Sequence, residues 1–277
     1  MARPNLSRLL GVAGLPLALA VVLAACSPTA TTPAQSDGSA AAGSSLSEVT
    51  DAGVLVVATE GTYRPFSFHQ DGTGDLTGYD VEVAKAVAEK LGVTAQFEET
   101  QWDAIFTGLD AGRFDMIANQ VTITPEREAA YSFSTPYTYS SGVVVVRSDD
   151  TSITSFADLD GKTAAQSLTS NWRALAEDSG ARIEAVEGWA QSVSLVEQGR
   201  VDATINDELT FLDYQKQTGA TGLKVAATTE DQSRTAFTFR AGSTALADAV
   251  DAALADLAAD GTLATISGTY FGQDVSR

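Results

Sequence analysis

A run of polar side chains from Asn119 to Arg127 is the part of the sequence best suited to binding a small ligand. It offers two amides (Asn119, Gln120), two hydroxyls (Thr122, Thr124) and the guanidinium of Arg127. A guanidinium pairs with a carboxylate through two parallel hydrogen bonds. These residue types therefore predict a site for a small carboxylate. The alternative is that Arg127 is a solvated helix residue paired with a neighbouring glutamate.

An acidic counterpart, Asp207 and Glu208, follows a second apolar strand. If both strand ends face one cleft, one wall binds a carboxylate through Arg127 and the other binds an ammonium through Asp207. That layout suits a free α-amino acid, because a ligand that lacks either group leaves a desolvated charge unpaired. The alternative for Asp207 is the N-cap of a helix over residues 208–216, and the two roles are compatible.

An internal repeat precedes both sites. Trp102 is followed ten residues later by Gly112 and then by Arg-x-Asp, and Trp189 begins the same spacing 87 positions further on, ending at Asp202. In each copy an apolar helix fills the interval, the glycine ends it, and a strand follows. The repeat predicts two α/β lobes of similar construction.

The elements that position the first site read as strand, turn and helix. The apolar runs 54–59 and 114–118 predict buried strands, and ligands bind at the carboxyl ends of such strands in α/β folds. Thr124 is expected to cap a short helix that begins at Pro125. Asp80 is expected to cap a helix over residues 81–91.

Two further strands and a helix start complete the second lobe. The run 142–146 predicts a strand that carries the chain from the first lobe to the second, and 235–240 predicts the return. A helix that starts at Thr169 or Ser170 presents unpaired backbone N–H groups, which favour an anion. The second lobe is therefore also expected to contact a carboxylate.

The N-terminal region is typical of an exported, lipid-anchored protein. Residues 1–25 combine a basic start with an apolar stretch, as a signal peptide does. Small residues precede Cys26, which is the pattern of a bacterial lipoprotein whose cysteine is lipidated and becomes the mature N-terminus. Residues 26–46 are rich in Ser, Thr, Ala and Pro, which predicts a flexible tether.

Composition excludes several classes of function. The formal charge of −19 argues against nucleic acid and anionic membranes as partners. Cys26 is the only cysteine, so no intramolecular disulfide forms. No spacing of ligands predicts a metal site, and no glycine loop or nucleophile elbow predicts a cofactor or a hydrolase.

From the tether onward the chain resembles family-3 extracellular solute-binding proteins, the receptors of polar amino-acid ABC importers. The resemblance rests on ATEGTYRPFSF, LTGYDVEVAKAVAEKLG, FDMIANQVTITPER, FSTPY, GRVDATIND and DGTLATISGTYFG, and ANQVTITPER, AQSLTSNW, INDELTFLDY and YFGQDVS are most similar to the cystine-binding branch. It implies a two-lobed, type II periplasmic-binding-protein-like α/β fold. Each lobe is a mixed sheet flanked by helices, and two hinge strands join the lobes. Lobe 1 is expected over residues 47–138 and 241–277, and lobe 2 over 139–240.

The resemblance also implies roles for individual residues. Arg127 and Thr122 hold the α-carboxylate with the helix start at Thr169 and Ser170, and Asp207 holds the α-ammonium. The remaining expected contacts are made by two aromatic residues that flank the ligand side chain and three polar residues that add hydrogen bonds: Tyr63, Trp102, Asn119, Gln120 and Ser167. Many relatives have glycine at the position of Ser167, so the added hydroxymethyl group affects side-chain specificity.

The sequence thus predicts a lipid-anchored receptor that binds an amino acid, with L-cystine as the leading candidate, and delivers it to an ABC permease and its ATPase. A monomer that needs no cofactor and performs no catalysis is expected. The alternative is an enzyme on the same scaffold, because cyclohexadienyl dehydratases resemble this family. Such an enzyme needs a general acid beside the substrate, and Glu60, Asp207 and Glu208 are the nearby carboxylates.

Overall fold

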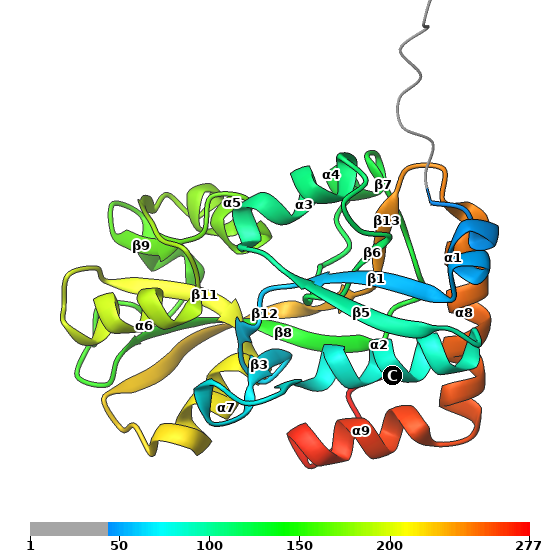
Figure 1. Ribbon diagram of the computed structural model, residues 1–277. Coiled ribbons are helices and arrows are strands. Elements are labelled where there is room, and N and C mark those ends of the chain that lie inside the picture. Colours follow the sequence, from blue (N-terminus) through cyan, green and yellow to red (C-terminus); the bar gives the residue numbers. More distant parts are fainter. Residues whose placement is uncertain (1–43) are drawn as a thin grey trace, which may run out of the picture. The chain divides into compact units, whose positions relative to one another are not determined.

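A computed structural model of the chain describes residues 44–277, and within them two five-stranded sheets form the framework (Figure 1). The predicted signal peptide, Cys26 and nearly all of the predicted tether lie outside the described residues. We call the elements around the first sheet lobe 1. Its strand order is β5 (Thr94–Glu99), β1 (Val54–Thr59), β6 (Met116–Ile117), β13 (Thr238–Arg240) and β7 (Tyr131–Phe133).

The second sheet is the framework of lobe 2. Its order is β10 (Arg182–Ala185), β9 (Thr163–Gln166), β11 (Ala203–Asp207), β8 (Thr138–Arg147) and β12 (Leu223–Thr235). The strands β10, β9 and β11 run parallel, whereas β8 and β12 pair antiparallel, so the sheet is mixed. A small sheet of β2 (Thr62–Tyr63), β3 (Ser67–His69) and β4 (Leu76–Thr77) follows β1.

The chain passes between the sheets twice. β7 of the first sheet leads into β8 of the second, and β12 leads back into β13 of the first. β8 and β12 pair from Thr138–Thr235 onward, with irregular register between Thr228 and Gln232, and they run side by side in Figure 1. The two-lobed α/β architecture with two hinge strands is therefore confirmed. The strand β13, which a division at residue 240 assigns to lobe 2, pairs with β6 and β7.

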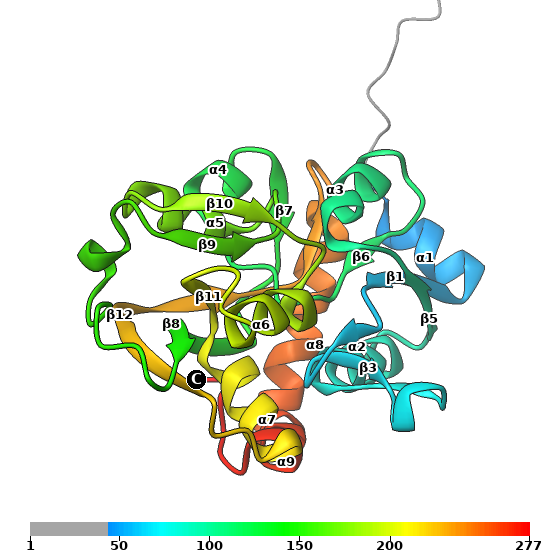
Figure 2. The same cartoon turned by 90° about the vertical axis from the view of Figure 1, so that its left-hand side faces the viewer.

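Helices cover both faces of each sheet, because side chains of a strand alternate between the faces. Leu55 and Val57 of β1 face one cluster, and Ala58 faces another. The first cluster holds α1 (Leu46–Ala52), α2 (Tyr79–Lys90), α8 (Thr244–Ala259) and α9 (Thr262–Phe271), and the second holds α3 (Trp102–Asp110). Lobe 2 is covered by α5 (Asn171–Asp178), the 3-10 turn Phe156–Leu159, α6 (Trp189–Glu197) and α7 (Glu208–Thr218); Figure 2 shows the last two beside β11.

The sequence repeat is a structural repeat. Trp102 begins α3 and Trp189 begins α6. Each helix is followed by a glycine with positive φ, a conformation that favours glycine. The aspartate after each glycine then accepts a backbone N–H from a neighbouring strand: Asp115 from Val56 at 2.9 Å and Asp202 from Thr163 at 2.8 Å. The two aspartates thus fix equivalent strands in the two lobes.

The prediction that Asp80 is the N-cap of α2 is wrong. The helix starts at Tyr79 with Gly78 as its N-cap, and Asp80 lies inside the first turn. The carboxylate of Asp80 is fully buried and accepts the backbone N–H and the side-chain amide of Gln120, both at 2.7 Å. The two hydrogen bonds from Gln120 offset the cost of removing the Asp80 carboxylate from water. These tertiary contacts, and not the helix start, therefore decide where the Asp80 side chain points.

Two properties of the described region bear on function. No helix among residues 44–277 is long and apolar enough to cross a membrane. In the same region no group of His, Cys, Asp or Glu side chains is arranged to hold a metal ion.

Candidate functional site

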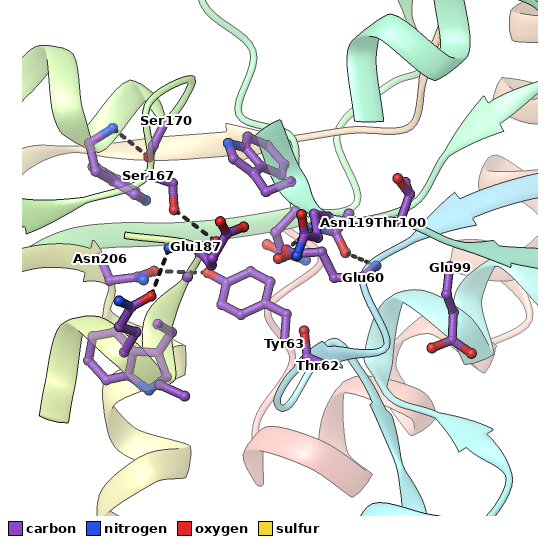
Figure 3. Close-up of a pocket in the computed structure, with 18 of the residues that line it drawn as sticks. Glu60, Thr62, Tyr63, Glu99, Thr100, Asn119, Ser167, Ser170, Glu187 and Asn206 are labelled. Carbon is purple, nitrogen blue, oxygen red and sulfur yellow. Dashed lines mark hydrogen bonds between the residues drawn. The ribbon is translucent and has the colours of Figure 1, made fainter. Parts of the chain in front are cut away.

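A cavity of about 460 Å³ lies between the two lobes (Figure 3). Its volume falls in the range of roughly 300–1,000 Å³ that is usual for small-molecule sites. Lobe 1 contributes the loop after β1, the region that joins β5 to α3, and the residues after β6. Lobe 2 contributes the loop before α5, the start of α6, and the end of β11. Six of the ten residues expected at the site line it: Tyr63, Trp102, Asn119, Gln120, Ser167 and Ser170.

The other four expected residues lie beside the cavity rather than in its lining, namely Thr122, Arg127, Thr169 and Asp207. Arg127 follows Pro125 in α4 (Pro125–Glu128), whose N-cap is Thr124 as expected. The Arg127 guanidinium donates to the carbonyl of Thr122 at 2.9 Å, and its carbon lies 5.5 Å from the centroid of the Trp102 ring. Arg127 therefore stands directly behind one wall of the cavity.

Arg127 is a desolvated cation. No carboxylate among residues 44–277 forms a salt bridge with it, so the alternative of a pair with a neighbouring glutamate does not occur there. Burial lowers the pKa of its guanidinium to about 10. It remains charged at neutral pH and lacks a full counter-charge, which is the state expected of a residue that binds an anionic group.

Asp207 caps α7 from inside lobe 2. Its carboxylate accepts the backbone N–H of Leu209 at 2.9 Å and the hydroxyl of Ser140 at 2.7 Å. Burial raises the pKa of Asp207 to about 6. The capping alternative is thus real in the structure, and the Asp207 carboxylate remains a buried charge next to Asn206, which lines the cavity.

Tyr63 connects the two lobes through the cavity. Its ring extends from β2 toward β11, and its hydroxyl donates to Asn206 at 2.8 Å and accepts from Thr210 at 3.1 Å (Figure 3). The neighbouring Arg64 contacts Asp213 of α7 at 3.4 Å. These contacts exist only when the lobes lie close together, so the structure has its cleft closed at this side.

Asn119 and Gln120 follow β6 but turn in different directions. Asn119 lines the cavity, and its side-chain amide donates to the carboxylate of Glu60 at 2.6 Å. Gln120 adopts a left-handed backbone with φ +50°, and its amide donates to Asp80 at 2.7 Å and to Thr138 at 3.2 Å. Its carbonyl oxygen accepts from Thr235 at 3.0 Å. The Gln120 side chain is thereby used to fasten both hinge strands to the site.

The loop before α5 carries the three remaining expected residues. Ser170 is the N-cap of α5 and accepts the backbone N–H of Trp172 at 3.1 Å. The hydroxyl of Ser167 donates to the carbonyl of Glu187 at 3.3 Å. The backbone N–H and the hydroxyl of Thr169 both donate to Asp103 of lobe 1. The carboxylate of Asp103 therefore occupies the anion position that was expected at this loop.

Sequence reasoning missed the acidic character of the cavity. Three glutamates line it, Glu60, Glu99 and Glu187, and no lysine or arginine is among its lining residues. The sequence alone indicates Glu60 only as a candidate general acid. It is partly buried, and desolvation raises its pKa to about 7 although Asn119 donates to it. Its position immediately after the buried strand β1 is the signal that identifies it as a cleft residue.

Two tryptophans of lobe 2, Trp172 and Trp189, also line the cavity. Together with Trp102 and Tyr63 they give it broad aromatic walls. Trp189 was visible in the sequence as the first residue of the second repeat, and Trp102 occupies the same place in the first repeat. The repeat therefore brings one tryptophan from each lobe to the cleft.

Comparison with known proteins identifies the family. Residues 55–273 match the bacterial extracellular solute-binding proteins, family 3. A probable amino-acid ABC transporter-binding protein of Haemophilus influenzae is 54% identical over 223 residues, which cover 80% of this chain and 86% of that protein. The L-cystine-binding protein TcyA of Bacillus subtilis is 49% identical over 243 residues, covering 88% of this chain and 90% of that protein.

Solved structures share the fold and differ in how well they superpose. An ancestral arginine-binding protein bound to arginine gives a TM-score of 0.74 at 33% identity, covering 79% of this chain and 99% of that chain. The L-cystine solute receptor of Neisseria gonorrhoeae in the unliganded open conformation gives 0.57 at 45% identity, covering 84% and 99%. The arrangement of the lobes is thus nearer to the arginine-bound structure than to the open one.

These relatives are named as binding proteins of transporters, so the chain is a binding protein and not an enzyme. Its fold is that of the type II periplasmic amino-acid-binding proteins. The chain belongs to the family-3 bacterial extracellular solute-binding proteins and is an extracytoplasmic amino-acid receptor of an ABC transporter, close to the cystine-binding members.

Proposed function

We propose that this protein binds L-cystine in the interlobe cavity and delivers it to an ABC permease, while a lipid on Cys26 keeps it at the membrane. The observation that carries the choice of ligand is the set of carboxylates in the cavity, with no basic side chain among the lining residues. A neutral amino acid has one ammonium, for which Asp207 suffices. A cavity with further carboxylates favours a ligand with a second cationic group.

The two ends of the ligand have distinct partners in this proposal. The α-carboxylate binds Arg127, which needs a counter-charge, with Thr122 and Thr169 nearby. The α-ammonium binds Asp207, and Tyr63 and Trp102 flank the central chain.

At the far end, the second ammonium of cystine binds Glu60 and Glu187. Its second carboxylate binds the side-chain amides of Gln101 and Gln191, which line the cavity. Asn119 and Ser167 position these groups. Gln120 and Ser170 act mainly through the backbone, because their side chains already have partners in the protein.

Arginine is the competing ligand, since it also has a cationic end, and one solved relative was determined with arginine bound. Arginine lacks a second carboxylate, whereas cystine has one. The relative named as an L-cystine-binding protein is 49% identical to this chain. The identity to this relative favours cystine over arginine, whereas the carboxylates of the cavity suit the cationic end of either ligand.

The anchoring part of the proposal rests on the sequence. Cys26 and the tether at residues 26–46 place the receptor near its permease, and the receptor acts as a monomer. Lobe 1 comprises residues 47–138 and 241–277 and lobe 2 residues 139–240, except that the strand β13 at the end of the second range belongs to the sheet of lobe 1. The last residues of the segment expected to be a flexible tether are structured, since Ser44 donates to Asp115 at 2.7 Å and Ser45 caps α1.

Ligand specificity is tested by a thermal-shift screen of the twenty amino acids and L-cystine, followed by calorimetry. Cystine is expected to give the largest shift. Addition of dithiothreitol, which splits cystine into two cysteines, is expected to abolish that shift. Residues 44–277 contain no cysteine, so the reductant leaves the folded domain unchanged.

Cystathionine serves as the control, because it keeps both amino-acid ends but has a thioether that dithiothreitol does not cleave. Its binding is expected to persist under reducing conditions. A larger shift with arginine than with cystine, or equal binding of cysteine, would overturn the cystine assignment. Absence of a shift with every amino acid would overturn the proposed function.

A further inference from the structure

Asp103 belongs to lobe 1, but its carboxylate forms hydrogen bonds only with residues of lobe 2. It lies in the first turn of α3, and its Oδ1 accepts the backbone N–H of Thr169 at 3.0 Å and the Thr169 hydroxyl at 2.8 Å. Its Oδ2 accepts the backbone N–H of Leu168 at 3.3 Å. All three donors belong to the loop before α5. An opening of the cleft therefore breaks all three hydrogen bonds at once.

Thr169 is held from its other side by Arg127. The guanidinium donates to the carbonyl of Thr169 at 3.2 Å and to the side-chain oxygen of Asn171 at 3.4 Å. Two side chains of lobe 1 with opposite charges thus bind the donor and the acceptor groups of one residue in lobe 2. Hydrogen bonds with a charged partner are stronger than those between neutral groups.

We propose that Asp103 is a positioning residue that fastens the loop of Leu168 and Thr169 to lobe 1 and stabilises the closed cleft. This inference rests on the proposed function, because it assigns to Asp103 a part in retaining the ligand. The carboxylate and its partners lie outside the lining of the cavity. A ligand can therefore occupy the cavity while Asp103 keeps all its hydrogen bonds.

The competing role for Asp103 is that of a substitute anion, which occupies the N–H of Thr169 until the ligand's carboxylate replaces it. The geometry favours the fastening role, since Arg127 has no carboxylate partner in the described region and is the stronger site for the ligand's carboxylate. The two roles predict opposite changes in affinity when Asp103 is removed.

The expected effect follows from the coupling of closure to binding. A ligand that is retained only in the closed state has an apparent affinity proportional to the population of that state. If a contact that forms only in the closed state is removed, the dissociation constant and the dissociation rate are therefore expected to rise by the same factor. The association rate changes little, because the open cleft that the ligand enters is unaltered.

The test compares Asp103→Ala and Asp103→Asn with Asp110→Asn in the full chain. Asp110 is the matched control, since it lies on the same helix but accepts a hydrogen bond from Tyr131 within lobe 1. For Asp103→Ala, calorimetry and stopped-flow fluorescence are expected to give an L-cystine dissociation constant and dissociation rate about tenfold higher, with the unfolding midpoint unchanged. Asp103→Asn is expected to be intermediate, and Asp110→Asn to match the wild type.

An unchanged or a lower dissociation constant for Asp103→Ala would overturn the proposal, and a lower one would support the substitute-anion role. Thr169→Val provides a second variant, which removes one of the three donors and is expected to raise the constant two- to threefold. If wild-type protein fails to bind cystine, the proposed ligand is wrong, and the same series is run with arginine. The inference on Asp103 then stands or falls on that series.

Discussion

The side-chain amide of Asn119 donates to Oε2 of Glu60 at 2.6 Å, while its carbonyl oxygen accepts the backbone N–H of Glu60 at 2.9 Å. One asparagine thus fixes both the backbone and the carboxylate of the residue that follows β1. The second carboxylate oxygen, Oε1, points toward lobe 2, since a Cβ placed on Gly188 would lie 3.8 Å from it. Glu60 is consequently presented to the cavity with one oxygen available for a ligand.

Glu60→Gln is expected to stabilise the ligand-free protein at alkaline pH and to weaken ligand binding. Burial raises the pKa of Glu60 from 4.5 to about 7. A raised pKa in the folded state means that its stabilising contribution is complete below about pH 4.5 and is lost as pH rises through 7. The variant is therefore expected to exceed the wild type by about 1–3 kcal/mol at pH 8 and to equal it near pH 4.

Denaturant unfolding at the two pH values measures this difference, and calorimetry with cystine at pH 8 is expected to show at least tenfold weaker binding. Glu98→Gln is the control, because Glu98 is an exposed glutamate of the neighbouring strand β5 that does not line the cavity. A stability difference that does not grow with pH would contradict the raised pKa. Unimpaired cystine binding by Glu60→Gln would remove Glu60 from the site.

Arg127→Ala is expected to weaken cystine binding by about 3 kcal/mol or more, because the ligand's carboxylate would be buried without a counter-charge. Arg127→Lys is expected to recover only part of the loss, since an ammonium cannot form the two-pronged pair. Calorimetry measures both constants. Arg182→Ala, a change of an exposed arginine on β10, serves as the control. Near wild-type affinity of Arg127→Ala would place the carboxylate elsewhere.

Asp207→Asn separates the capping role of this residue from its charge. Asparagine is as good an N-cap as aspartate, so α7 is expected to keep its start. Because burial raises the pKa of Asp207 from 3.8 to about 6, the unfolding midpoint is expected to equal that of the wild type below about pH 4 and to exceed it above pH 6. The lost charge removes the counter-ion for the α-ammonium, and affinity is expected to fall at least tenfold. Far-UV circular dichroism and calorimetry check the two parts. Full affinity of this variant would leave Asp207 with the structural role alone.

The fold was readable from the sequence because its signals are local and repeated. The spacing from Trp102 to Asp115 and from Trp189 to Asp202 encodes one helix-turn-strand unit in each lobe, and the structure confirms both units. Element ends were less predictable. The strand expected over residues 114–118 is regular only at Met116 and Ile117, for example, while Asp115 and Ala118 on either side still donate backbone N–H groups to β1.

Several features of the site depend on contacts that no local pattern encodes. The side-chain amide of Gln120 is held by Asp80, which lies 40 positions earlier in the chain. Glu60 and Glu187 come from different lobes, and their joint acidity appears only when the lobes lie together. Asp103 reads as an ordinary first-turn acidic residue, which is favourable at a helix start. Only the closed structure reveals its partners in the other lobe.

Cys26→Ser is expected to release the protein from the membrane fraction into the soluble fraction. Cys26 lies outside the described residues, so this prediction rests on the small residues that precede the cysteine in the sequence. A serine cannot form the thioether that carries the lipid, and stable anchoring requires two or more acyl chains.

Cell fractionation with immunoblotting measures the distribution, and labelling with an alkyne-tagged palmitate analogue measures the lipid. Ser27→Ala, a change at the next position, is expected to leave both results unaltered. If the Cys26→Ser protein stayed in the membrane fraction and kept its label, the attachment site would have to lie at another residue.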